Sequence, residues 1–287
     1  MLTLLPRLRF LLLLAACLTA ACGSVVRRAT TQFSDSLTMA VLDQDDPALV
    51  RDGLPGYLLL IDSRIAANPT DVDTLLAGAK LYGAYAGSFV EDAVRAQTLS
   101  HRAYGYARRA LCLREKPLCD TLDSPYEKFA DALKRADAKD IATLYGFAAA
   151  WAGRIQTHTG DWNAIADLPK LQALLERCDA IDPHFDGGGA ALYLGVVDSI
   201  RPASLGGKPE EGRKWFERAL ELSGGKNQMV RVLYAQFYAR LVFDQSLHDK
   251  LLNEVLAANT DAPGLTLINT LAKQKAKALL ASGKDFF

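Results

Sequence analysis

Two cysteines near the start of the chain stand where a thiol can become lipidated. Arg7 and Arg9 precede the apolar stretch LLLLAACLTAACGS, in which two small residues stand before Cys17 and again before Cys22. Small-small-Cys after an apolar run resembles a bacterial lipobox. There the thiolate takes a diacylglyceryl group, and the cysteine becomes the mature amino terminus. The run is too short for a membrane span, which takes about 20 residues.

The flanking residues decide between the two cysteines. Leu14 stands three places before Cys17, which fits the lipobox consensus, but that choice leaves a very short apolar run. Gly-Ser after Cys22 is typical of the start of a flexible tether. We therefore predict that Cys22 is acylated. Plain secretion, with cleavage nearby, is the alternative.

Three cysteines remain in the body of the chain. Lys116-Pro117 turns the chain between Cys112 and Cys119, and an exported protein permits disulfides. We predict a disulfide between these two, with a pair of buried thiols as the alternative. Cys178 is expected to be a core residue. The four histidines are scattered, with no pair at ligand spacing, so we expect no metal site and no cofactor.

The bulk composition describes a soluble globular body. The 33 basic residues balance the 33 acidic ones, so no net field recruits nucleic acid, and 50% of the residues are hydrophobic. The acidic residues are spread as on solvated helix faces. No Ser-His-Asp or Cys-His arrangement has a recognisable context, so we expect no enzyme.

Helical periodicity runs through nearly the whole chain after residue 34. Apolar residues recur three and four places apart, as in Val230, Leu233, Tyr234 and Phe237. Most of the Gly, Pro, Asn and Asp stops fall roughly 35 to 45 residues apart, the period of a two-helix repeat. An extra segment, 126–136, fills a wider interval. We predict an all-α fold of five hairpins and a last helix: 34–47 with 54–68, 71–88 with 94–113, 139–159 with 167–181, 188–200 with 209–222, 227–243 with 247–258, and 265–282. The predicted divisions are a lipoprotein signal peptide over 1–21, a lipidated tether over 22–33 and a single helical-repeat domain over 34–287.

The hairpins favour tetratricopeptide-like geometry, stacked as an α-solenoid. Leu194-Gly195 stands where that repeat places Leu-Gly, and Gly195 lets the partner helix approach closely. The full consensus does not occur in any one unit. Such hairpins bury their apolar faces by stacking on their neighbours.

Segments along nearly the whole mature chain resemble one family, the T-component family of TRAP (tripartite ATP-independent periplasmic) transporters. They include AACGS, DQDDPALVRDGLPGYLLLIDS, LYGAYAGSFVEDAVRA, ALCLREKPLCD, GGGAALYLG and LGGKPEEGRKWFERALELSGGKN. The resemblance implies a periplasm-facing lipoprotein that partners the periplasmic solute-binding protein of a TRAP system. It also implies a homotrimer with a pore or cleft through each protomer. The acylated cysteine of the family falls on Cys22, and no catalytic motif is carried over. Gly and Ser after Cys22 favour the outer membrane.

Candidate site residues follow from the predicted helices. Aromatic side chains on the first helices of hairpins could line a pocket, with core packing as the alternative for each: Tyr82, Tyr85, Trp151 and Tyr193. In THTGDWNAIADLP, Trp162 and Asn163 could contact a ligand or partner. A helix cap with a buried tryptophan is the alternative there. Three arginines could pair with the carboxylate of an anionic ligand, or be solvated surface residues: Arg154, Arg201 and Arg231.

The sequence therefore predicts a lipid-anchored accessory protein of a TRAP transporter. It would bind the solute-binding protein and hold or conduct a small organic acid or apolar ligand. The alternative is an envelope-assembly scaffold that contacts lipoproteins or peptides and has no small ligand. An uncharacterised hydrolase ranks last. SLGGKPEEGRKW is predicted to be an inter-helix turn, because Lys208 is followed by proline and no strand precedes it.

Overall fold

The computed structural model describes residues 38–158 and 160–287. This part of the chain is all-α, as predicted, and contains no strand. Cys22, the predicted signal peptide over 1–21 and the predicted tether over 22–33 lie outside the described residues.

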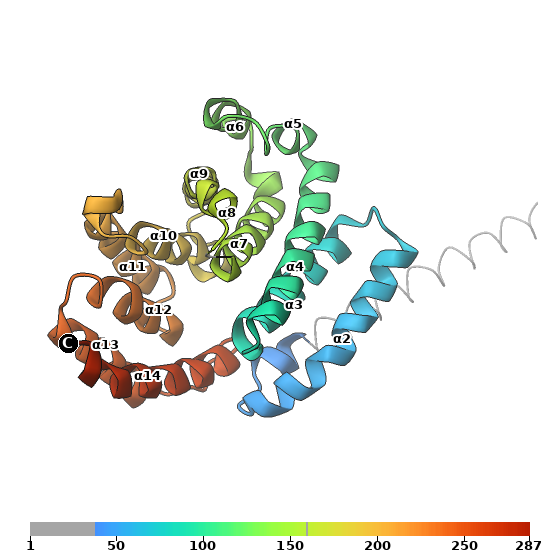
Figure 1. The fold of residues 1–287 in the computed structure, drawn as a ribbon. Helices are drawn as coiled ribbons and strands as arrows, with labels where there is room; N and C mark the ends of the chain where they lie inside the picture. Colours follow the sequence, from blue (N-terminus) through green and yellow to red (C-terminus); the bar gives the residue numbers. More distant parts are fainter. Residues whose placement is uncertain (1–37, 159) are drawn as a thin grey trace, which may run out of the picture.

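The helices follow one another closely (Figure 1). After a short helical stretch at 38–42 come α2 (Pro47–Ala67), α3 (Val72–Phe89), α4 (Ala93–Arg114), α5 (Lys116–Cys119), α6 (Tyr126–Leu133), η1 (Ala138–Asp140), α7 (Ile141–Thr157), α8 (Trp162–Ala166), α9 (Leu168–Ile181), η2 (Phe185–Gly187), α10 (Gly189–Ser199), η3 (Ala203–Leu205), α11 (Pro209–Leu222), α12 (Gln228–Leu233), the π-helix η4 (Tyr234–Ala239), α13 (Gln245–Ala257) and α14 (Thr266–Phe286).

Four of the five predicted pairs are in contact: α3 with α4, α7 with α9, α10 with α11, and η4 with α13. In the α10–α11 pair, a Cβ atom built on Gly195 would lie 2.9 Å from the Phe216 ring, so the missing side chain permits the close approach. The tetratricopeptide-like array itself stays a prediction, since α5, α6 and α8 stand between the pairs.

Three predicted helices differ clearly from the structure. The helix expected over 34–47 ends at residue 42, and its expected partner over 54–68 begins earlier, at Pro47. The Asp46 carboxylate accepts hydrogen bonds from the first-turn backbone, and Pro47 occupies a position where no N–H is needed. The helix then continues through Pro55. The helix expected over 227–243 passes from α12 into η4, which ends at Ala239.

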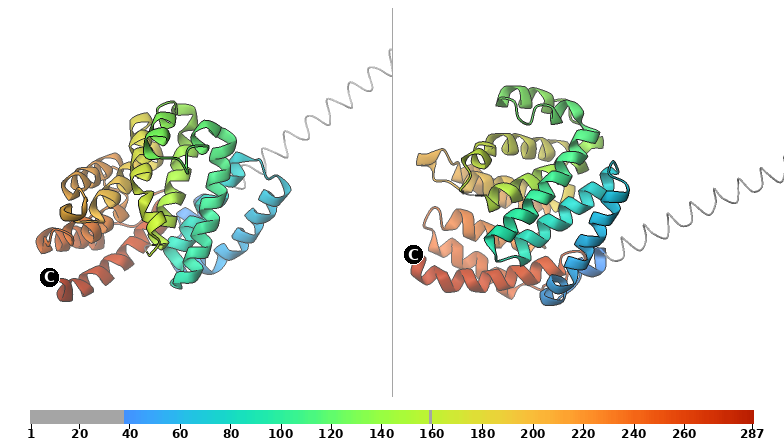
Figure 2. Two further views of the ribbon diagram at one scale, coloured as in Figure 1. Left: turned by 45° about the horizontal axis from the view of Figure 1, so that its top comes forward. Right: turned by 45° about the vertical axis from the view of Figure 1, so that its right-hand side comes forward.

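The first and last long helices of the described chain meet. Leu267 of α14 shares a hydrophobic cluster with Val50 and Leu54 of α2. Beside it, the Gly264 backbone N–H donates a hydrogen bond to the Asp43 carboxylate. The views show α14 beginning beside α2 and running past α13 to the carboxyl end, so the helices curve round until the first and last long helices meet (Figures 1 and 2).

Candidate functional site

Tyr82 belongs to a network that ties three helices together. The Tyr82 and Tyr106 hydroxyls each donate to the Asp62 carboxylate at 2.7 Å, and Arg102 donates to it at 3.0 Å. Burial raises the pKa of Tyr106 to about 12, with the Asp62 hydrogen bond adding to the rise. Tyr82 is only 2% exposed. Because these hydrogen bonds join Asp62 of α2 to side chains of α3 and α4, they fix the three helices relative to one another.

Trp151 and Tyr85 are also buried. The Trp151 indole N–H donates to Asp167 at 3.1 Å, and its ring packs among aromatic neighbours. One turn along α7, the Arg154 guanidinium lies 4.7 Å from the centre of the Tyr104 ring. Its Nε is buried and has no acceptor among the residues that the structure describes. The structure places Tyr85 and Trp151 in the core rather than on an open surface.

Trp162 lies on the surface. The Asp161 carboxylate accepts from the Asn163 backbone N–H at 2.9 Å and so starts α8. This matches the predicted cap, but the Trp162 side chain is 82% exposed rather than buried. The amino end of α4 lies next to the end of α7, which precedes Trp162, because the Gln97 side chain donates to the Thr157 carbonyl there. The Trp162 indole at this end of the helices is therefore accessible to a binding partner.

Tyr193 is the one aromatic candidate on a first helix that is half-buried. Its ring centre lies 6.3 Å from that of Tyr145, whose hydroxyl donates to Asp186 at 2.7 Å. Lys80 of α3 approaches the same carboxylate at 3.7 Å. Asp186 has a φ of 51°, an unusual value for a residue with a side chain, and it precedes the glycine turn into α10. Aromatic and polar groups of α3, α7 and α10 therefore meet at this turn.

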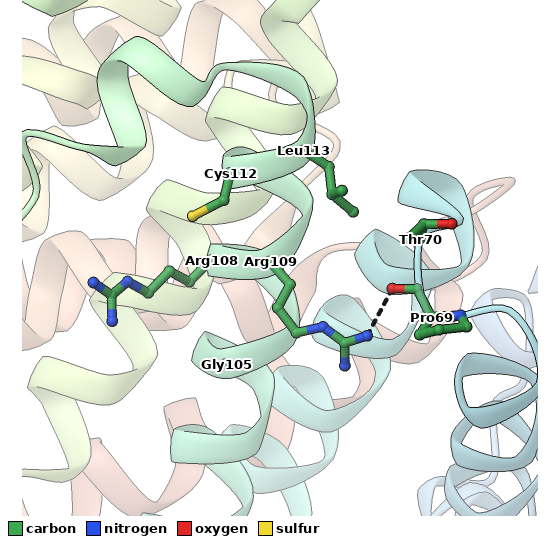
Figure 3. A pocket seen from close by; sticks show the side chains of 7 residues that line it. All are labelled: Pro69, Thr70, Gly105, Arg108, Arg109, Cys112 and Leu113. Atoms are coloured by element: carbon green, nitrogen blue, oxygen red, sulfur yellow. Dashed lines mark hydrogen bonds between the residues drawn. The ribbon is translucent and has the colours of Figure 1, made fainter.

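Cys112 and Cys119 are bonded in a disulfide that joins the end of α4 to α5. Cys178 is a buried thiol, and burial raises its pKa to about 12. Beside the disulfide, Arg109 donates to the Pro69 carbonyl at 2.7 Å across a pocket (Figure 3). The pocket is lined by Pro69, Thr70, Gly105, Arg108, Arg109, Cys112 and Leu113.

The other two candidate arginines have different surroundings. Arg231 donates to Glu254 at 3.0 Å and to the Gly225 carbonyl at 3.0 Å, so its partners are within the chain. Arg201 has a buried Nε with no acceptor in the described part of the chain. It follows α10, near the buried Asp198.

Asp198 should make the free energy of unfolding depend on pH. Burial raises the pKa of its carboxyl to about 6, against the opposing charge of Lys208. The folded state then binds more protons than the unfolded state between about pH 4 and 6. The free energy of unfolding should therefore fall by about 1–3 kcal/mol as the pH rises through this window. Asp198→Asn should remove that slope and stabilise the protein at pH 7, as urea unfolding at pH 4.5 and 7.5 would show. Equal slopes in both proteins would contradict the assignment.

No group of His, Cys, Asp or Glu side chains suited to a metal ion occurs within 38–158 and 160–287. In the same residues, no helix is both long enough and apolar enough to cross a bilayer.

Tryptophan is enriched among the residues that contribute most to protein interfaces, and Trp162 is such a residue on the surface. The chain belongs to the TRAP transporter T-component family, whose model matches residues 43–287. The family gives it an accessory role in TRAP transport, and is not known for enzymes. The chain is also similar to an uncharacterized protein of Treponema pallidum (strain Nichols). The two are 25% identical, and the alignment covers 95% of each chain.

Sequence reasoning missed the carboxylates that organise these regions. Asp62 and Asp198 each interrupt an apolar stretch, in LLLIDSRI and GVVDSI. A charged residue at a buried position needs a partner or a shifted pKa, and that interruption was the available signal. The partners themselves lie too far away in sequence to be predicted from local spacing.

Proposed function

We propose that the chain is a lipid-anchored, periplasm-facing accessory protein that binds the solute-binding protein of a TRAP transporter. The observation that carries this proposal is the family match over residues 43–287. The family supports the transport role, and the binding partner is our extension of it.

The anchor is the acylated Cys22, with the outer membrane as the favoured location. A diacylglyceryl group plus an N-acyl chain gives stable attachment, whereas a single acyl chain binds only marginally. In this proposal the segment between Cys22 and residue 38 joins the anchor to the helical body.

The docking surface for the solute-binding protein is the end of the helices that carries Trp162. Val94, in the first turn of α4, is 71% exposed at the same end. Tryptophan contributes more to protein interfaces than most residues, because it buries a large rigid area with a polar edge. This surface supplies an apolar anchor without a catalytic group.

The ligand is a small organic acid or apolar molecule held in, or conducted through, a cleft of each protomer of a homotrimer. The turn at Asp186 supports this part of the proposal, since half-buried Tyr193 packs beside Tyr145 there, and Tyr145 and Lys80 both contact the Asp186 carboxylate. The buried, unpaired Nε atoms of Arg154 and Arg201 are further candidate donors to a carboxylate.

Trp162→Ala should weaken binding of the solute-binding protein about tenfold or more, because a buried interface tryptophan contributes at least 1–2 kcal/mol. Calorimetry with the solute-binding protein of the TRAP system that this chain serves would measure the change. The melting temperature should stay the same, since the Trp162 side chain is 82% exposed.

Leu205→Ala is the matched control, because this leucine is also exposed, at 68%, but lies elsewhere on the fold. Its affinity should equal that of the wild type. If the wild-type chain does not bind the solute-binding protein, the proposed partner is wrong. If both variants bind normally, the docking surface lies elsewhere.

A further inference from the structure

The pocket beside the disulfide has the volume of a small-molecule site. It measures about 610 Å³, within the range of roughly 300–1,000 Å³ that ligand pockets occupy. It lies between α4 and the turn that joins α2 to α3 (Figure 3). None of its lining residues belongs to the Asp186 turn or to the surface around Trp162, so this pocket is separate from the sites of the proposed function.

The α4 side of the pocket carries positive charge. This helix contains five arginines and no acidic residue. Arg108, on the pocket wall, pairs with Asp123 at 2.8 Å, so an acid within the chain meets its charge. Arg109, the next residue, has no carboxylate partner among the residues that the structure describes. Asp71 in the α2–α3 turn accepts from the Thr74 hydroxyl at 2.6 Å instead.

The Arg109 side chain is held across the pocket. One amino group of its guanidinium donates to the Pro69 carbonyl at 2.7 Å and so ties α4 to the α2–α3 turn (Figure 3). The remaining N–H groups have no acceptor within 38–158 and 160–287. A carbonyl satisfies one donor but does not neutralise the charge. A fixed guanidinium with unused N–H groups suits a carboxylate, which it can bind through two parallel hydrogen bonds.

The lining next to Arg109 is largely apolar. Gly105 lies one turn earlier on α4, and a Cβ atom built on it meets nothing within 4 Å, so its missing side chain leaves space beside the guanidinium. Leu113 is 47% exposed at the other end of the pocket. Cys112, between them, is bonded to Cys119, which fixes this wall. These surfaces can cover a short apolar chain.

We propose that this pocket binds a small organic acid, with the carboxylate on Arg109 and the apolar body over Gly105 and Leu113. Charge and lining together define the ligand class. A neutral molecule would leave the guanidinium unpaired, and a carboxylate without an apolar body would leave the rest of the pocket uncovered. The inference does not rest on the proposed function, because it uses neither the solute-binding protein nor the cleft at Asp186.

Chemical modification of the full chain in its own membranes tests the site, with hexanoate as the probe. Phenylglyoxal reacts with accessible guanidinium groups, and tandem mass spectrometry locates each modified arginine. Saturating hexanoate should slow the modification of Arg109 at least about fivefold, compared with chloride at equal ionic strength, because the bound carboxylate covers its N–H groups. Exposed Arg135, which has no ion pair in the described part of the chain, is the internal control and should react at an unchanged rate.

Two analogues of hexanoate separate the charge from the apolar body. Hexanol has the same chain without the charge, and acetate has the charge without the chain. Each should protect Arg109 about tenfold less effectively than hexanoate does, because each lacks one of the two contacts. Equal protection by acetate would show a simple ion pair at an accessible guanidinium, and equal protection by hexanol would show that Arg109 does not bind the charge. Either result would overturn the proposal.

Gly105→Leu should block the pocket while it keeps the guanidinium and favours the helix. The hexanoate concentration that gives half-protection of Arg109 should rise about tenfold or more, because the new side chain occupies the space of the apolar body. Gly87→Leu on α3 is the matched control, since a Cβ atom there also meets nothing within 4 Å. Its half-protection concentration should equal that of the wild type.

Arg109→Gln gives a readout that does not depend on chemical modification. Hexanoate should raise the melting temperature of the wild type and of Arg135→Gln, but not that of Arg109→Gln, because a ligand stabilises only the protein that binds it. Three results would overturn the proposal: no protection of Arg109 in the wild type, unchanged half-protection in Gly105→Leu, or a full rise in melting temperature for Arg109→Gln. Unchanged circular dichroism of the variants would show that the helices are intact.

Discussion

Replacing Cys22 with alanine should move the protein from the membrane fraction to the soluble fraction of the cell envelope. The expected change is large because, in the proposed function, covalent acyl chains form the anchor. Each buried CH₂ contributes about 0.8 kcal/mol to membrane binding. In the described residues, no helix is long and apolar enough to replace it. Fractionation and immunoblotting would measure the distribution, and mass spectrometry of the mature amino terminus would detect the lipid.

Cys17→Ala is the matched control for this prediction. It stands in the same signal segment and also follows two small residues, so it tests the rival acylation position. We expect Cys17→Ala to leave the protein at the membrane. If Cys22→Ala stays there while Cys17→Ala becomes soluble, the acylated residue is Cys17.

Trp151→Ala should lower the free energy of unfolding by about 3–5 kcal/mol, the range for a large aromatic residue removed from a core. Trp151 is 1% exposed and lies against Phe147 and Phe129, with ring centres 5.1 and 6.1 Å away. The substitution also leaves the buried side of Asp167 without its indole donor. Urea unfolding followed by circular dichroism would measure the loss.

Trp162→Ala provides the comparison within the same protein. Because this side chain is 82% exposed, its removal should change the free energy of unfolding by less than about 0.5 kcal/mol. Trp151→Phe should fall between the two, since it keeps a ring but loses the hydrogen bond. Equal stabilities for the two alanine variants would contradict the assignment of Trp151 to the core.

The sequence was most informative where a local signal and the tertiary structure agree. The predicted helix 209–222 matches α11 at both ends, because Pro209 begins it and Ser-Gly-Gly follows Leu222. The prediction was wrong at α2, because it began a new helix at residue 54, whereas Gly53 and Pro55 lie inside one continuous helix. Tertiary packing of Val50, Leu54 and Leu58 outweighs these local costs.

The π-helix η4 could not be predicted from the spacing of apolar residues. Its wider hydrogen bonding inserts one residue into the helical pattern, so an apolar spacing of three and four cannot reveal it. Local spacing also could not predict the candidate site, because its contacts join residues far apart in the sequence. Tyr82 was noticed as an aromatic residue, but its acceptor Asp62 lies 20 residues away and Tyr106 is 44 residues from that carboxylate. The spacing indicated helices and turns, and not which side chains meet.

The contact between α2 and α14 changes how the protein would bear a mechanical load. An open row of helical hairpins that is pulled by one end can peel away one hairpin at a time, because each unit contacts only its neighbours. In this chain, tension from a lipid anchor would enter near residue 38. It would pass at once into α14 through the Asp43–Gly264 hydrogen bond and the Leu267 cluster. Two separate parts of the sequence would then share the force, so the helices next to the membrane tether would resist being pulled open.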